Sequence, residues 1–198
     1  YWGSGAAAKY VQAGKLLPLG DYLADGVTGK LKTGSMKAFT YDGTIYSLPM
    51  YSWYLTLFCN KTLFAKAGAK IPGTWDELFD AVQKQKAIGV EPIASGARDG
   101  WNAALIYQAL ALRETGAENI QRMLEGQKDF GDDPGYSEAA EMVVKLFKEG
   151  AFGTSPLDES NDDANDKFQV GTAAMRLTGS WFLNTLYNAR DDSSQVSM

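Results

Sequence analysis

The residues best placed to hold a ligand are tryptophans that follow short apolar strands. Residues 172–177 are predicted to form a strand, and Thr178-Gly179-Ser180 leads from it to Trp181, with Ser180 as a possible N-cap of the next helix. Open α/β sheets hold ligands beyond the carboxyl ends of their strands, where an indole can offer its flat face. Trp181 is therefore a candidate ligand contact. The alternative is a core role, in which Trp181 anchors its own helix.

A second tryptophan occupies a comparable place in the chain. Residues 92–95 are predicted to form a short strand, and the loop after it leads into an apolar helix that begins at Trp101. Asp99 is predicted to cap this helix. Arg98 could reach a ligand hydroxyl or carboxylate from the same loop, and its alternative role is that of a solvated loop charge.

The composition excludes several kinds of catalytic chemistry. The 198 residues contain no histidine and one cysteine, which rules out Ser-His-Asp and Cys-His machinery, His-ligated zinc and an internal disulfide. Cys59 lies in an apolar run and is predicted to be a buried, inert thiol. Catalysis would have to use carboxylates, lysine or tyrosine, and we expect neither a cofactor nor a metal.

Two acidic runs, residues 129–133 and 158–166, raise the possibility of a calcium site. Neither run has the alternating ligands, central glycine and closing glutamate of a calcium loop. Aspartate and asparagine are also enriched where helices begin, because they accept hydrogen bonds from the first backbone N–H groups. We therefore predict that both runs cap helices.

The charge pattern narrows the possible partners. The net charge is −5 and the basic residues are scattered, so nucleic acid and anionic membranes are poor partners. No apolar run approaches the ~18 residues of a membrane-spanning helix.

The order of predicted elements, with strands alternating with helices, indicates an α/β fold. The apolar run from Trp53 to Cys59 is predicted to be a strand covered on both faces, in the centre of a sheet. Thr74 and Glu77 form a predicted capping box for a helix that Gly89 ends, and Trp75 is predicted to anchor that helix to the sheet. Residues 137–149 form an amphipathic pattern whose predicted inward side chains are Met142, Val143, Leu146 and Phe147.

Four ordered motifs resemble one protein family. Phe168, Gly171, Ala173, Ala174 and Met175, followed by Gly179 and Trp181, are similar to the late signature of the extracellular solute-binding proteins of bacterial ABC importers, in their sugar-binding, maltose-binding-protein-like group. Residues 41–50 and 54–61 resemble the hairpin, proline turn and strand by which that family crosses between its two lobes. Residues 73–78 follow in the family's order.

The resemblance implies a domain organisation. It predicts a type II periplasmic-binding-protein-like fold in which residues 1–47 are a remnant of the first lobe and of the approach to the hinge, and residues 48–198 form the second lobe. Family members are considerably longer and the chain starts at Tyr1, so we expect a truncated or processed piece whose least stable part is 1–47. The implied location is extracytoplasmic, either in the periplasm or on the cell surface as a lipoprotein.

The resemblance also implies a function. It predicts a binding protein rather than an enzyme, which captures a carbohydrate in an aromatic cleft and works with the membrane permease of an ABC importer. Apolar sugar faces stack on indoles while polar groups select among isomers. A carboxylate stands in maltose-binding protein at the position of Trp53, which implies a different ligand here. The implied ligand contacts are Trp181, Trp101, Trp53 and Tyr51, with Arg98 and Asp99 beside them and Trp2 on the opposite lobe.

Two other functions stay open at this point. The same fold could bind a non-sugar solute, such as a peptide, a polyamine or a metal-organic anion. A glycosidase would need two opposed carboxylates, for which Asp99 and one of Asp132, Asp133 or Glu138 are the candidates, although nothing in their spacing places them in opposition. Because the chain would hold only one wall of a cleft, we expect it to bind ligand weakly.

Overall fold

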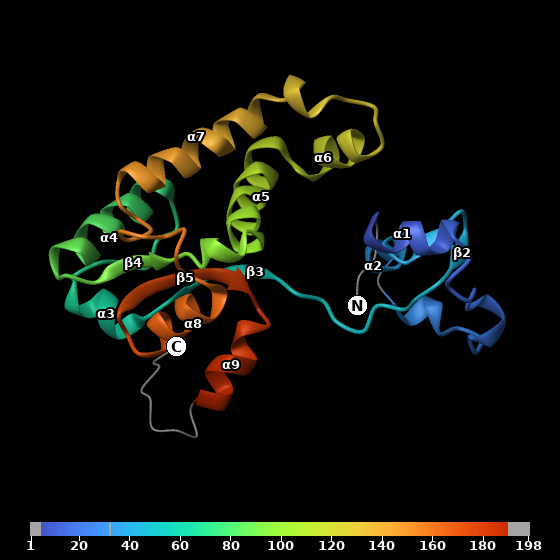
Figure 1. Cartoon of the computed structure of the whole chain (residues 1–198), viewed down its shortest axis with the longest axis horizontal. Helices are drawn as coiled ribbons and strands as arrows, with labels where there is room; N and C mark the ends of the chain where they lie inside the picture. Colours follow the sequence, from blue (N-terminus) through green and yellow to red (C-terminus); the bar gives the residue numbers. More distant parts are fainter. Residues whose placement is uncertain (1–4, 32, 190–198) are drawn as a thin grey trace. The chain divides into compact units, whose positions relative to one another are not determined.

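The computed structural model describes residues 5–31 and 33–189, which form two compact units (Figure 1). The first unit is Tyr1–Trp53 and the second is Tyr54–Met198. The division falls a few residues after the predicted boundary at 47/48, and the assignment of the two units to two lobes stays a prediction.

The first unit is small and contains no buried side chain among its described residues. Its hairpin turns at Asp42-Gly43, as predicted, and both residues adopt positive φ angles of 48° and 77°. With so little apolar surface removed from water, the hydrophobic effect contributes little to its stability. Its elements are α1 (Gly5–Gln12), η1 (Gly20–Tyr22), η2 (Thr28–Lys30), α2 (Thr33–Lys37) and the antiparallel pair β1 (Thr40–Tyr41) and β2 (Thr44–Ile45).

In the second unit, the described residues 54–189 form a three-stranded sheet with the order β3-β5-β4. β5 (Ala173–Gly179) lies in the centre, parallel to β4 (Glu91–Ala94) and antiparallel to β3 (Leu55–Cys59). One edge of the sheet therefore collects the carboxyl ends of β4 and β5 and the amino end of β3.

The prediction of a central strand over Trp53–Cys59 is wrong in its placement. β3 begins at Leu55 and lies at the side of the sheet, and Leu55 itself is 37% exposed. The run is apolar because Leu57 packs on one buried cluster and Phe58 on another. Apolar residues on both faces of a strand do not reveal whether a second strand pairs with it on each side.

Helices cover both faces of this sheet, which confirms the α/β class. The larger buried cluster joins the sheet to α3 (Lys61–Lys66), α4 (Trp75–Ala87), α5 (Trp101–Thr115) and α7 (Pro134–Lys148). A smaller cluster joins it to α8 (Asn161–Gln169) and α9 (Phe182–Ala189), which lie on the other side of the strands (Figure 1). The remaining elements are η3 (Ala97–Asp99), α6 (Ala117–Leu124) and η4 (Phe130–Asp132).

Local helix signals agree with the structure. The Thr74 side chain accepts a hydrogen bond from the Glu77 N–H at the start of α4, and Gly89, with φ of 74°, follows the end of that helix. The Glu77 carboxylate accepts from the Gly73 N–H rather than from Thr74, so the capping box is only half formed. Trp75 packs partly buried against the larger cluster, which confirms its role as an anchor.

The inward face of α7 differs from the prediction at one residue. Ala139 and Leu146, two helical turns apart, are buried, and Met142 and Val143 pack beside them. Phe147 is 58% exposed, so the prediction that it faces inward is wrong. A residue next to Leu146 is rotated about 100° away from the buried stripe, because an α-helix has 3.6 residues per turn.

Candidate functional site

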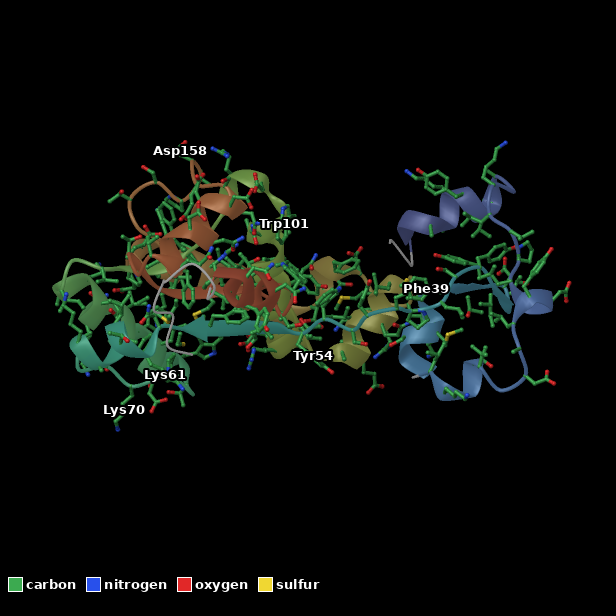
Figure 2. All side chains as sticks on the ribbon, turned by 90° about the horizontal axis from the view of Figure 1, so that it is seen from below. Phe39, Tyr54, Lys61, Lys70, Trp101 and Asp158 are labelled. Atoms are coloured by element: carbon green, nitrogen blue, oxygen red, sulfur yellow. The ribbon has the colours of Figure 1, made fainter. Side chains whose placement is uncertain are left out.

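Two tryptophan side chains meet at the edge of the sheet where β4 and β5 end. Gly179 at the end of β5 pairs with Leu55 of β3, and Trp181 follows Gly179 by two residues. Trp101 begins α5 after β4 and Tyr54 precedes β3, and both are labelled in Figure 2. Tyr54 is 64% exposed and Trp101 is 42% exposed. The rings of Trp101 and Trp181 are 6.1 Å apart between centroids and tilted by 53°.

Trp181 combines a core contact with a place in this aromatic pair. Its ring packs against the smaller cluster, at Phe168, Phe182 and Leu186, while the residue is only partly buried. The core role that the sequence left open is therefore present, and the ring also meets Trp101. A ligand contact by Trp181 stays a prediction.

Ser180 ties the start of β3 to the end of β5. Its N–H donates to the Tyr54 carbonyl at 2.8 Å, and its Oγ accepts from the Tyr54 N–H at 3.1 Å. The side chain of Ser180, which the sequence predicts to cap the next helix, thus bonds to the neighbouring strand and fixes the backbone of Tyr54 just before β3.

Asp99 does not cap α5, which corrects the prediction. The N-cap of α5 is Gly100, and the Asp99 carboxylate instead accepts a 2.6 Å hydrogen bond from the N–H of Asn161, the first residue of α8. The first N–H groups of α8 lack partners within their own helix, and its dipole attracts an anion there. The sequence could not reveal this partner, which is 62 residues away.

Arg98 reaches the same segment as Asp99. In its guanidinium group, Nη1 donates to the Asp158 carbonyl at 3.3 Å and Nη2 lies 3.8 Å from the Asp163 carboxylate. The backbone N–H of Arg98 donates to the Glu159 carbonyl. Its side chain remains 57% exposed. Contacts from Arg98 and Asp99 to a ligand stay predictions.

Arg176 in β5 is a buried arginine that the sequence analysis missed. Arg176 in β5 is fully buried, and burial lowers the pKa of its guanidinium to about 10. The available signal was one basic residue inside an otherwise apolar strand. Its acceptors are the carbonyls of Ala94, Ser95 and Leu177 and the amide oxygens of Asn102, Asn161 and Asn165.

Glu159 is a second buried charge near the end of β4. One carboxylate oxygen accepts from the N–H and the hydroxyl of Ser95 and from the Gly96 N–H. The other oxygen lies 3.1 Å from the Lys167 ammonium group. Glu159 therefore holds the loop after β4 against the segment before α8.

The acidic runs cap helices, as predicted. Asp133 is the N-cap of α7 and accepts from the Gly135 N–H, and Ser160 and Asp163 form a reciprocal capping box at the start of α8. A hydrogen bond from Lys128, helped by Thr115, holds the pKa of Asp133 below its usual range. Within the described ranges, His, Cys, Asp and Glu residues form no group suited to a metal ion.

The other predicted site residues belong to the first unit. Tyr51 and Trp53 stack with ring centroids 5.5 Å apart and an angle of 27°, and both are exposed. Trp2 lies outside the described residues, as does the strand predicted at 195–198. The structure thus pairs Trp101 with Trp181, and Tyr51 with Trp53.

Two further properties bear on the setting of the site. Cys59 is partly buried, and burial raises the pKa of its thiol to about 11, in agreement with an inert thiol. None of the helices formed by residues 5–31 and 33–189 is long and apolar enough to cross a membrane.

Comparisons with known proteins show similarity to one family along most of the chain. The family model for bacterial extracellular solute-binding proteins matches residues 1–196. The multiple sugar-binding protein of Streptococcus mutans is 31% identical over 166 residues, which are 79% of this chain and 40% of the relative. A structure solved in work on xylan utilization by Caldanaerobius polysaccharolyticus is 35% identical, with a TM-score of 0.90 over 99% of this chain and 49% of that chain.

A chitin oligosaccharide binding protein of known structure is also similar. It is 31% identical, with a TM-score of 0.85, over 93% of this chain and 47% of that chain. The chain described here therefore spans less than half the length of each of these three relatives.

Proposed function

Because the chain belongs to the family of bacterial extracellular solute-binding proteins, we propose that it supplies a carbohydrate-binding surface of an ABC importer's solute-binding component. In this proposal the ligand is a mono- or oligosaccharide, the location is extracytoplasmic, and the macromolecular partner is the importer's membrane permease. Residues 48–198 correspond to the second lobe of the binding protein and residues 1–47 to part of the first.

The observation that carries the proposal is the tilted pair of Trp101 and Trp181 at the carboxyl edge of β4 and β5. Ligands of open α/β sheets bind beyond this edge. Stacking on indole rings suits the apolar C–H faces of pyranose sugars, and 42% of Trp101 is exposed to solvent.

The relatives support a carbohydrate over another solute. One relative above 30% identity is described as sugar-binding and another as binding chitin oligosaccharides. Both polymers named for the similar structures, xylan and chitin, are chains of pyranose rings. We therefore propose an oligosaccharide of this kind as the ligand.

We further propose binding without catalysis. Two carboxylates that a glycosidase mechanism could use have structural partners, since Asp99 bonds to the start of α8 and Asp133 caps α7. A chromogenic glycoside incubated with the protein should release no chromophore. Turnover that Asp99→Asn abolishes would contradict this part of the proposal.

Ligand-observed saturation-transfer NMR tests the proposal, because it detects weak binding. Xylo-oligosaccharides and chito-oligosaccharides should receive magnetisation from the protein, and Trp181→Ala and Trp101→Ala should each reduce the transfer. Trp75→Phe is the matched control, since Trp75 anchors α4 within the larger cluster. Transfer that is absent, or that survives both edge substitutions, would contradict a carbohydrate site at this edge.

A further inference from the structure

The buried Arg176 connects the two strand ends that carry the aromatic pair. Arg176 and Trp181 belong to the same stretch of chain, because Trp181 follows β5 by two residues. The Arg176 Nη2 donates to the Asn102 amide oxygen at 3.3 Å, and Asn102 is the residue next to Trp101. A short path of covalent and hydrogen bonds therefore joins one indole to the other.

Asn102 has its full set of partners within this path. It is 1% exposed, and its Nδ2 donates to the Gly96 carbonyl at 3.3 Å and to the Asn161 amide oxygen at 3.2 Å. The same Asn161 oxygen accepts from Arg176 at 2.9 Å, so Arg176, Asn102 and Asn161 form a closed triangle. A buried amide with three partners holds a single orientation, because each alternative leaves a buried polar atom unbonded.

The space around the triangle is closed. A Cβ on Gly96 would lie 2.9 Å from the Asn102 Nδ2 and 3.0 Å from the Asn161 Cα. Gly96 also has a φ of 61°, a conformation that favours glycine. The loop after β4 can therefore pass this close to Asn102 and Asn161 only with glycine at position 96, and Asn102 bonds the first turn of α5 to that loop.

We propose that Arg176 is a positioning residue for the ligand-stacking pair: through Asn102 and Asn161, its guanidinium sets the start of α5 and the angle between Trp101 and Trp181. Six neutral acceptors surround the guanidinium, and Glu159 is the carboxylate whose charge acts on it. A buried charge is costly unless it is fully bonded, so this centre tolerates little movement of the groups that bond to it. The part of this inference that concerns the ligand rests on the proposed function.

Circular dichroism of the ligand-free protein reports the angle between Trp101 and Trp181, because two indole rings this close to each other give an exciton couplet whose strength depends on that angle. Trp101→Phe and Trp181→Phe identify the couplet by removing it. Arg176→Lys keeps the charge but cannot span the same acceptors, and Asn102→Ala breaks the link to α5 while Arg176 remains. Both variants should lose most of the couplet and give weaker saturation transfer to xylo-oligosaccharides.

Thr115→Val is the matched control. Thr115 lies at the other end of α5 and donates a buried 3.0 Å hydrogen bond to Asp133, so its loss destabilises the same helix without touching the triangle. This variant should keep the couplet. If Asn102→Ala or Arg176→Lys melts cooperatively and still shows the wild-type couplet, the inference is wrong.

The two proposals can fail separately. The couplet is measured without ligand, so it judges the role of Arg176 even if the protein binds no carbohydrate. Saturation transfer that is absent from the wild-type protein, together with a couplet that Asn102→Ala removes, would reject the carbohydrate site and retain the positioning role.

Discussion

The indole of Trp181 lies directly against the backbone of Gly179. A Cβ at position 179 would stand 2.0 Å from one ring carbon of Trp181 and 2.2 Å from the next, a separation that no folded structure accommodates without a shift. Trp181 can occupy its position only because residue 179 has no side chain. Glycine is needed at position 179 for this space and not for an unusual φ angle.

Gly179→Ala should displace Trp181 from Trp101. The added methyl group and the indole cannot occupy the same space, so the ring must turn away or the end of β5 must move. We expect a reduced exciton couplet, a shifted tryptophan emission and a lower melting temperature. Gly29→Ala is the control, because a Cβ there meets no atom within 4 Å. An unchanged couplet in Gly179→Ala would show that Trp181 does not occupy this position.

Asp133 should make the protein less stable in acid. The hydrogen bond from Lys128 and the other donors hold the pKa of Asp133 in the folded protein below its usual range. The ionised carboxylate therefore stabilises the folded state above the unfolded-state pKa of about 3.9, and this stabilisation is lost as the pH falls through the lower pKa of the folded state. Urea unfolding at a series of pH values should show a steeper loss below about pH 4 in the wild type than in Asp133→Asn. Asp132→Asn, the exposed neighbour, should follow the wild-type curve.

Cys59 should react slowly with alkylating reagents in the folded protein. With a pKa of about 11, on the order of a thousandth of the thiol is ionised at pH 8, whereas a free thiol of pKa about 8.5 is about a quarter ionised. Iodoacetamide labelling followed by mass spectrometry should therefore be about a hundredfold slower or more in buffer than in urea. Equal rates in the two conditions would mean that the thiol is neither buried nor protonated.

Ser160 should contribute measurably to the stability of the second unit. It caps α8 by accepting from the Asp163 N–H, and Ser160→Ala leaves that N–H without its partner. The loss in the free energy of unfolding should be about 1 kcal/mol. Ser137→Ala, at an exposed position within α7, is the control and should change stability little. A smaller effect for Ser160 than for Ser137 would argue against the cap.

Features determined by neighbouring residues were predictable from the sequence. Thr74 and Gly89, which the sequence marks as the two ends of α4, stand where it places them, and Gly89 has a φ of 74°. Each of these depends on hydrogen bonds within one turn of helix, so the residue types carry the information. The same holds for Trp101 and Trp181, whose places after strands follow from local patterns.

Features that depend on distant partners were not predictable. The place of β3 beside β5 depends on which strands pair, and the apolar run of β3 is compatible with a centre or an edge. Asp99 meets a helix 62 residues away, and Arg176 bonds to segments up to 82 residues away. The sequence pattern around these residues does not indicate which distant residues they contact, so the hydrogen bonds of Arg176 near the aromatic pair could be found only in the structure.

The closed set of bonds around Arg176 also makes two separate stretches of sequence depend on each other. The loop before α5 and the start of α8 share Asn102, Asn161 and the carboxylates that bond to each other's backbone. Replacing either stretch alone with that of a relative would strand a buried amide or guanidinium, at a cost of about 1–3 kcal/mol for each unmet group. Under the proposed function, a chimaera that exchanges only the loop after β4 and the start of α5 would keep the indole of Trp101 but lose the hydrogen bonds that set its angle to Trp181.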